Sequence, residues 1–247
     1  MILVNKIDIN CDLGEGMGNE ALLMPLISSC NIACGGHAGD TSTMETVVTL
    51  AKDYKVKIGA HPSFPDQENF GRKVLKMTSE LLHNSIYEQI DNLKTILDKQ
   101  NVPLHHIKPH GALYNLAAVD ENTASIIVDV VKRFGNEIFL YVPFQSIISE
   151  TASKEGLQVK FEAFADRNYN QDLTLVSRTE EHAVIHDSEA MFQHMYPMII
   201  DGKVTAINGV EVELKADTFC VHGDGEDVVK NLKDLIVKLR KNNIEIS

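Results

Sequence analysis

Short apolar runs alternate with longer amphipathic runs along the whole 247-residue chain. Each short run is bounded by turn residues, which is typical of buried parallel strands. Strand–helix alternation through an entire chain predicts an α/β fold, with a parallel sheet and helices packed outside it. The spacing alone leaves an incomplete barrel and an open doubly wound sheet as alternatives. The seven predicted strands cover residues 6–11, 31–34, 56–60, 104–108, 137–142, 157–163 and 218–221.

The longer runs have helical periodicity. In residues 78–100 the apolar residues Leu82, Ile86 and Ile90 recur at one helical face. Pro197 falls inside a later helical run and predicts a kink there. No linker or internal repeat divides the chain, so we expect a single domain over residues 1–247. Capping residues or a helix-starting proline predict further helix starts near Thr41, Asp120, Pro143, Asp187 and Asp227.

Two stretches, residues 62–73 and 166–187, show no clear helical periodicity. Long irregular segments in compact domains are often lids or binding loops. For 166–187, the spacing of Leu173 and Leu175 equally allows a small β excursion at the sheet edge. The sequence leaves both interpretations open.

The composition argues against several classes of function. The net charge is −12 and the pI about 5.2, so the surface repels nucleic-acid phosphates, and nucleic-acid binding is not expected. Membrane insertion is not expected either, because no apolar run approaches the roughly 20 residues that a spanning helix needs. The N-terminal residues show no signal-peptide pattern. The four cysteines form no CxxC motif, so we expect a cytoplasmic protein with reduced thiols.

Charged and imidazole side chains, together with glycines, follow nearly every predicted strand. Because the carboxyl ends of parallel strands lie on one rim, residues far apart in the sequence are expected to converge there. Side chains two apart on a strand face the same way, so Asp8, Asn10 and Asp12 form one row. The sequence therefore predicts a functional site at this rim. Its candidates are Asp12, Glu15, His37, His61, Lys108, His110, Asp166, Arg167, His222 and Asp224.

His37 and His61 end consecutive predicted strands, and with Asp12 they can form a carboxylate–histidine–histidine site for a divalent metal. No short-range metal motif is present, so the same side chains suit general acid–base chemistry as well. Lys108 is expected either to form a buried ion pair with Asp8 or Asp12, or to polarise a substrate carbonyl.

Several motifs are absent. No GxxxxGK[ST] loop or strand-following GxGxxG motif occurs, so nothing in the chain looks built for ATP or a dinucleotide. There is no GxSxG motif, and the apolar strand contexts of Cys11 and Cys34 disfavour nucleophilic roles. Four histidines outside the rim clusters are interpreted as structural or surface residues: His83, His182, His186 and His194.

Seven segments, in order from residue 8 to residue 225, resemble the LamB/YcsF family, which includes one component of the bacterial 5-oxoprolinase complex. They are DINCDLGEGMG, SSCNIACGGHAGD, IGAHPSFPD, FGRK, IKPHGALYN, FEAFADRNY and DTFCVHGDG. The chain departs from the family pattern at Gly36, where an aromatic residue is common, and at Lys73, where a second arginine is usual. Gly36 leaves more room beside His37.

The resemblance implies a seven-stranded parallel (β/α) barrel similar to the glycoside hydrolase/deacetylase fold. It also implies ATP-dependent hydrolysis of 5-oxo-L-proline to L-glutamate in a complex with 5-oxoprolinase subunits B and C. ATP and Mg²⁺ would be bound through the complex, since this chain has no phosphate loop. The partners are expected to activate the lactam by phosphorylation, and this chain to hydrolyse the activated ring.

The resemblance also suggests roles for the rim residues. Asp12 or His61 would activate water, while Lys108 and His110 would stabilise charge on the lactam oxygen. Arg167 would pair with the substrate carboxylate, because its planar guanidinium matches a carboxylate bidentately. Asp12, His37 and His61 would hold any divalent metal. Further substrate contacts are expected from Asn10, Glu15, His37, Arg72, Asp166, His222 and Asp224.

Two other functions remain open at this point. A stand-alone metal-dependent amidohydrolase or sugar deacetylase would need neither ATP nor partner subunits. A non-catalytic scaffold component of a lactam-using complex would tolerate substitutions at the rim. Fold similarity favours the first and multi-subunit organisation the second.

Overall fold

Seven parallel strands form a closed barrel in the computed structural model, which describes residues 5–225 and 227–247. The strand order around the barrel is β10-β2-β3-β4-β5-β6-β7, and β10 closes the ring against both β2 and β7. Each of the seven predicted strands overlaps a barrel strand, and the seven-stranded parallel barrel that the family resemblance implies is confirmed. The strands are β2 (Ile9–Leu13), β3 (Ser29–Ala33), β4 (Lys57–His61), β5 (His106–Ile107), β6 (Phe139–Pro143), β7 (Gln158–Phe164) and β10 (Thr218–His222).

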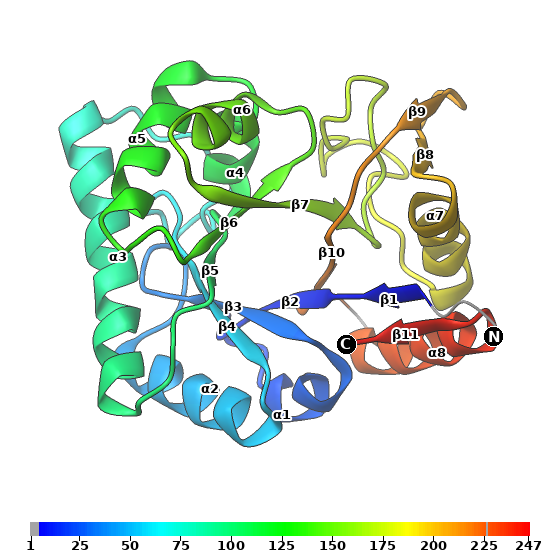
Figure 1. Ribbon diagram of the computed structural model, residues 1–247, viewed down its shortest axis with the longest axis horizontal. Coiled ribbons are helices and arrows are strands. Elements are labelled where there is room, and N and C mark those ends of the chain that lie inside the picture. The colour runs from blue at the N-terminus through cyan, green and yellow to red at the C-terminus, as the bar shows by residue number, and fades with distance from the viewer. Residues whose placement is uncertain (1–4, 226) are drawn as a thin grey trace.

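Helices surround the barrel (Figure 1). The described residues form eight α-helices and one 3-10 helix, Met24–Leu26. Asp40, Asp120 and Asp187 each accept a backbone N–H bond at a helix start, as the sequence predicts. One predicted start is wrong, because the helix expected near Pro143 begins at Ile147 behind a Ser146 cap. The α-helices are α1 (Glu20–Leu23), α2 (Thr41–Tyr54), α3 (Ser79–Lys99), α4 (Gly111–Ala117), α5 (Glu121–Lys132), α6 (Ile147–Lys154), α7 (Ser188–Ile200) and α8 (Val228–Lys241).

Four short strands lie outside the barrel. β1 (Asn5–Ile7) pairs in parallel with β11 (Ile244–Ile246), and β8 (Lys203–Thr205) pairs antiparallel with β9 (Glu211–Glu213). Each has only three residues, which is too short for an alternation pattern to be recognised. The strand predicted over 6–11 is divided at Asp8, whose Oδ1 accepts hydrogen bonds from Ser29 Oγ and Thr218 Oγ1.

The two predicted irregular segments are loops at the carboxyl ends of the strands. Residues 62–73 follow β4, and residues 166–187 follow β7. The second segment has only two isolated β-bridges, Arg167 with Val184 and Tyr169 with Leu175. α7 continues through Pro197 to Ile200. Within the described parts of the chain, no helix has both the length and the apolar character needed to cross a membrane.

Candidate functional site

A cavity of about 490 Å³ opens at the carboxyl ends of the barrel strands. Residues of both irregular loops, such as Arg72 and Val176, form part of its wall. This is the rim where α/β barrels bind ligands. Seven of the twelve predicted site residues line the cavity: Asp12, His61, Arg72, Lys108, His110, Arg167 and His222.

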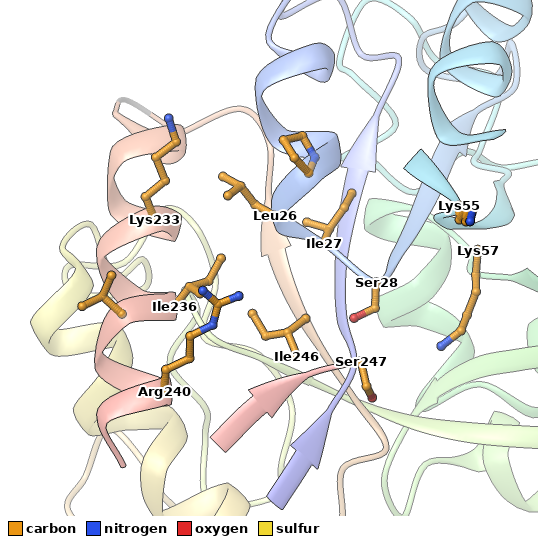
Figure 2. A pocket seen from close by; sticks show the side chains of 12 residues that line it. Leu26, Ile27, Ser28, Lys55, Lys57, Lys233, Ile236, Arg240, Ile246 and Ser247 are labelled. Atoms are coloured by element: carbon orange, nitrogen blue, oxygen red, sulfur yellow. The ribbon is translucent and has the colours of Figure 1, made fainter. Parts of the chain in front are cut away.

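A second cavity of about 530 Å³ lies at the opposite end of the barrel (Figure 2). It lies beside the starts of β3 and β4, between α8 and β11, and Lys57, Lys233 and Arg240 contribute cationic groups. The described side chains that line it include no carboxylate and no imidazole. Because carboxylates and imidazoles are the groups most often used in general acid–base chemistry, the carboxyl-end cavity is the candidate site.

Lys108 lies between two buried carboxylates at the cavity floor. Its Nζ donates to Asp12 Oδ1 at 2.9 Å and forms an ion pair with Glu162 Oε1, also at 2.9 Å. Cys220 Sγ is a further partner at 3.0 Å. Lys108 is only 2% exposed, so the two carboxylates together offset the cost of burying its charge.

The charged states of this group follow from the contacts. Burial alone would raise the pKa of Asp12, but His61 and Lys108 hold that pKa well below its usual range. Burial opposes the charge on Lys108, yet Asp12, Cys220 and Glu162 raise its pKa well above the usual value. Asp12 is therefore a carboxylate and Lys108 an ammonium at neutral pH.

A layer of polar side chains lies beneath this pair inside the barrel. Asn31 Nδ2 donates to Asn10 Oδ1 at 2.8 Å and to Asp12 Oδ1 at 2.7 Å, while His106 Nε2 donates to Asn31 Oδ1 at 2.7 Å. Asn10 is fully buried in this layer and does not line the cavity. Asn10 is linked to Asp12 through Asn31, which donates to both, and a contact between Asn10 and substrate stays a prediction.

Three histidines and one carboxylate gather beside Asp12. Glu15 Oε1 lies 2.8 Å from His37 Nε2, 3.5 Å from His110 Nδ1 and 3.9 Å from His61 Nε2. His61 Nε2 is also 3.3 Å from Asp12 Oδ2 and 2.9 Å from His110 Nδ1. The loops after β2, β3 and β5 and the end of β4 supply these residues, so the predicted convergence at one rim is confirmed for them.

Backbone carbonyls fix the orientation of two of the rings. His61 Nδ1 donates to the Lys108 carbonyl at 2.7 Å, and His110 Nε2 donates to the Phe70 carbonyl at 3.0 Å. Burial lowers the pKa of His37 and lowers that of His110 well below its ordinary value. The bond to the Phe70 carbonyl places a proton on His110 Nε2, on the side away from Glu15 and His61. The roles of His110 and Lys108 towards a lactam oxygen stay predictions.

The loop 62–73 holds this arrangement through a strained turn. Phe70 has a φ of 55°, a left-handed conformation that is rare for an aromatic residue and is found at functional sites. Gly71 follows with a φ of 62°, and a Cβ atom there would lie 3.0 Å from both His110 and His37. The loop therefore needs glycine at position 71 to approach the two rings.

Asp166 and His222 form a second pair across the cavity. His222 donates to Asp166 from its backbone N and from Nδ1, both at 2.9 Å. Burial opposes ionisation of Asp166, but His222 and its hydrogen bonds hold the Asp166 pKa below its usual value. His222 lines the cavity, and its other ring nitrogen, Nε2, has no hydrogen-bond partner among the described residues.

Arginines surround the cavity mouth. Arg72 Nη2 pairs with Asp224 Oδ2 at 2.6 Å, and Asp224 itself is not among the residues that line the cavity. Arg167 Nη2 donates to the Val176 carbonyl at 2.5 Å and Nε to the Ala183 carbonyl at 3.3 Å. Arg167 thus fixes the 166–187 loop while also lining the cavity with Arg178.

The structure contains two groups of side chains that can hold a divalent metal. One is Glu15, His37, His61 and His110, and the other is Asp12, Cys220 and His222. The predicted set of Asp12, His37 and His61 is divided between them. His37 and His61 belong to the first group, whereas Asp12 belongs to the second.

The sequence analysis did not identify Glu162. It lies within β7, two residues before Phe164 and four before Asp166, so the alternation used for Asp8, Asn10 and Asp12 applied here as well. An acidic residue near the carboxyl end of a predicted strand was the missed signal. The sequence was right about the thiols, because burial raises the pKa of Cys11 and Cys34, which disfavours a nucleophilic role.

The chain is similar to known proteins over nearly its full length. The LamB/YcsF family model matches residues 7–247. A protein named as the A subunit of 5-oxoprolinase, from Haemophilus influenzae (strain PittEE), is 41% identical over 244 residues, covering 99% of this chain and 100% of the relative. One of the same name from Campylobacter jejuni subsp. jejuni serotype O:23/36 (strain 81-176) is 42% identical, covering 98% and 96%. The crystal structure of the lactam utilization protein from Thermus thermophilus superposes with a TM-score of 0.91 at 36% identity, covering 98% of each chain.

Proposed function

The chain belongs to the LamB/YcsF family, and we propose that it is the hydrolytic component of an ATP-dependent 5-oxoprolinase. In this proposal it opens the lactam ring of 5-oxo-L-proline, giving L-glutamate. The relatives carry the name of one subunit of an enzyme, which supports assembly with other subunits. We assign ATP and Mg²⁺ to partner subunits B and C, because this chain has no phosphate-binding loop.

The observation that carries the proposal is the carboxyl-end cavity, where Asp12, His61 and Lys108 meet. Hydrolysis of a cyclic amide needs a base for water and a positive group near the carbonyl oxygen. The Asp12 carboxylate supplies the base, and its Oδ2 lies 3.3 Å from His61 Nε2. Lys108 lines the same cavity and supplies the positive charge.

The arginine side chains of the cavity wall suit the carboxylate group of the substrate. 5-Oxoproline carries one carboxylate, and Arg72, Arg167 and Arg178 all line the cavity. Arg167 is partly engaged with the backbone of the 166–187 loop, so a substrate carboxylate would bind next to a loop that the same arginine positions. Guanidinium groups suit this contact because they bind carboxylates through parallel hydrogen bonds.

Reconstitution tests the proposal. The chain is mixed with the candidate partner subunits, ATP, Mg²⁺ and 5-oxoproline, and both glutamate and ADP are measured. We expect glutamate only when this chain, the partners and ATP are all present. Glutamate formation by the partners alone would remove this chain from the reaction.

The histidine cluster favours one alternative, a stand-alone metal-dependent amidohydrolase or deacetylase. The same reconstitution separates the two functions. Amide hydrolysis by the isolated chain, without ATP or partners, would replace the proposed function with the alternative.

A further inference from the structure

Ring nitrogens of His61 and His110 face each other inside the barrel rim. Their outward ring nitrogens donate to the Lys108 and Phe70 carbonyls, so in the neutral rings the inward nitrogens carry no proton. These inward atoms, His61 Nε2 and His110 Nδ1, are 2.9 Å apart. Two lone pairs at that distance repel unless a cation or a proton lies between them.

The donor set and its spacing suit a metal ion. Two atoms that each lie about 2.1 Å from one ion are roughly 3.0–3.4 Å apart in octahedral or tetrahedral coordination. The inward nitrogens are 2.9 Å apart, and Glu15 Oε1 lies 3.5 Å from His110 Nδ1 and 3.9 Å from His61 Nε2. Shifts of a few tenths of an ångström bring the three atoms onto one ion.

His37 also contacts the Glu15 carboxylate, but its ring is not oriented to bind the same metal ion as His61 and His110. Its ring is stacked on that of His110, with centroids 3.7 Å apart and an interplanar angle of 3°. The lone pairs of two parallel rings lie in separate parallel planes, so they cannot converge on one ion. His37 Nε2 lies 2.8 Å from Glu15 Oε1, which fits a hydrogen bond that orients the carboxylate.

The surroundings of His61 and His110 have features that are typical of metal-binding sites in proteins. Metal-binding histidines usually donate their second N–H to a carbonyl or carboxylate, as His61 and His110 do. The carbonyl that orients His110 belongs to Phe70, a residue in left-handed conformation. Both histidines are almost fully buried, which limits competition from water.

We infer that Glu15, His61 and His110 bind one divalent transition-metal ion, with His37 as a positioning residue for Glu15. Two imidazoles and one carboxylate favour Zn²⁺ or a similar ion over Mg²⁺, which prefers oxygen ligands. This inference deepens the proposed function, because a divalent ion supplies Lewis-acid polarisation of a carbonyl at the cavity wall. It differs from the set of Asp12, His37 and His61 that the sequence suggests.

Metal binding is tested on the isolated full-length chain, without ATP or partners. The protein is stripped with a chelator and titrated with ZnCl₂ by calorimetry, and bound zinc is measured by elemental analysis after gel filtration. We expect about one equivalent per chain. Titration with CoCl₂ is expected to give visible d–d absorption, which reports coordination directly.

Matched variants identify the ligands. Glu15→Gln and His110→Ala are expected to lose the bound equivalent and the cobalt spectrum, with folding checked by circular dichroism. His37→Gln is expected to weaken binding by about 10–100-fold. His222→Ala and Asp12→Asn, from the other cluster, are expected to retain the equivalent.

A wild-type chain that binds no zinc would overturn the inference and assign the 2.9 Å contact to a shared proton. Loss of metal in His222→Ala or Asp12→Asn, with retention in His110→Ala, would also overturn it. These outcomes leave the proposed function untouched, because that function is judged by glutamate formation in the assembled complex.

Discussion

Lys108 is the common partner of two buried acids, Asp12 and Glu162, at 2.9 Å each. All three side chains are at most 3% exposed. Removal of one member of such a group leaves uncompensated charge in a medium of low dielectric constant, which is strongly destabilising. Lys108, the cation of the proposed mechanism, is therefore also part of what stabilises the barrel.

Lys108→Met is expected to lower the free energy of unfolding by about 3–5 kcal/mol. Urea unfolding followed by circular dichroism measures this loss. The double variant Lys108→Met/Glu162→Gln is expected to recover part of it, because one unpaired carboxylate is gone.

The matched control is Lys132→Met. Lys132 pairs with Glu155 at 2.6 Å, but both side chains are at least 40% exposed. An exposed pair contributes roughly 0–1 kcal/mol, so this variant should stay close to wild type. A loss for Lys108→Met no larger than that for Lys132→Met would contradict the account of the buried group.

Sequence patterns predicted most of the residues at the carboxyl-end site, but only some of the contacts among their side chains. The position of Asp12, His61 and Lys108 at strand ends follows from the parallel topology. The buried ion pair of Lys108 with Asp12, one of the predicted alternatives, is confirmed. The pairing of Lys108 with Glu162 was not predicted, because that contact depends on the register and closure of the barrel. The same holds for Glu15, whose place among the histidines depends on the path of the loop after β2.

In the proposed function, the 166–187 loop forms part of the substrate-binding wall, because its residues line the carboxyl-end cavity. Backbone hydrogen bonds within the loop include Val176 N to the Asn168 carbonyl and Ile185 N to the Asp166 carbonyl. Arg167 adds two side-chain bonds to loop carbonyls, those of Val176 and Ala183. Lysine cannot reproduce this planar donor geometry, so these two contacts depend on the guanidinium group.

Arg167→Lys is expected to increase hydrogen–deuterium exchange across residues 176–186 and to raise the KM for 5-oxoproline. Exchange in α3 should remain unchanged, which serves as the internal control. Unchanged exchange in the loop of the variant would show that other contacts hold it.

Element prediction succeeded where a segment was long and periodic, as in α3, and failed where it was short. The β8–β9 hairpin has three residues in each strand, which cannot be distinguished from a loop by pattern. α4 was missed for a similar reason, since its seven residues follow the glycine-containing rim sequence directly. Tertiary packing rather than local preference stabilises these elements.

Several buried histidines couple the stability of the whole molecule to pH. Burial lowers the pKa of His105 and that of His194 to about 4 each, and lowers that of His106 well below the ordinary value. In the unfolded chain these groups titrate near about 6.5. At a pH between the folded-state and unfolded-state pKa values, the unfolded chain binds more protons than the folded chain, so a lower pH favours unfolding.

The free energy of unfolding should therefore fall as the pH is lowered from about 7 towards 5. Each histidine contributes a slope of at most about 1.4 kcal/mol per pH unit. Urea titrations at several pH values measure the slope. His194→Gln should reduce it, whereas substitution of the exposed His182 should not. A flat wild-type profile over this range would contradict the assignment of neutral buried rings.

The central claim is that the carboxyl-end cavity, and not the cavity at the other end of the barrel, performs the hydrolysis. Glutamate formation by the reconstituted complex should be compared for Asp12→Asn and for Lys233→Ala, which changes the opposite cavity (Figure 2). The account predicts a loss of roughly a hundredfold or more for Asp12→Asn and wild-type turnover for Lys233→Ala. Full activity in a correctly folded Asp12→Asn complex would contradict it.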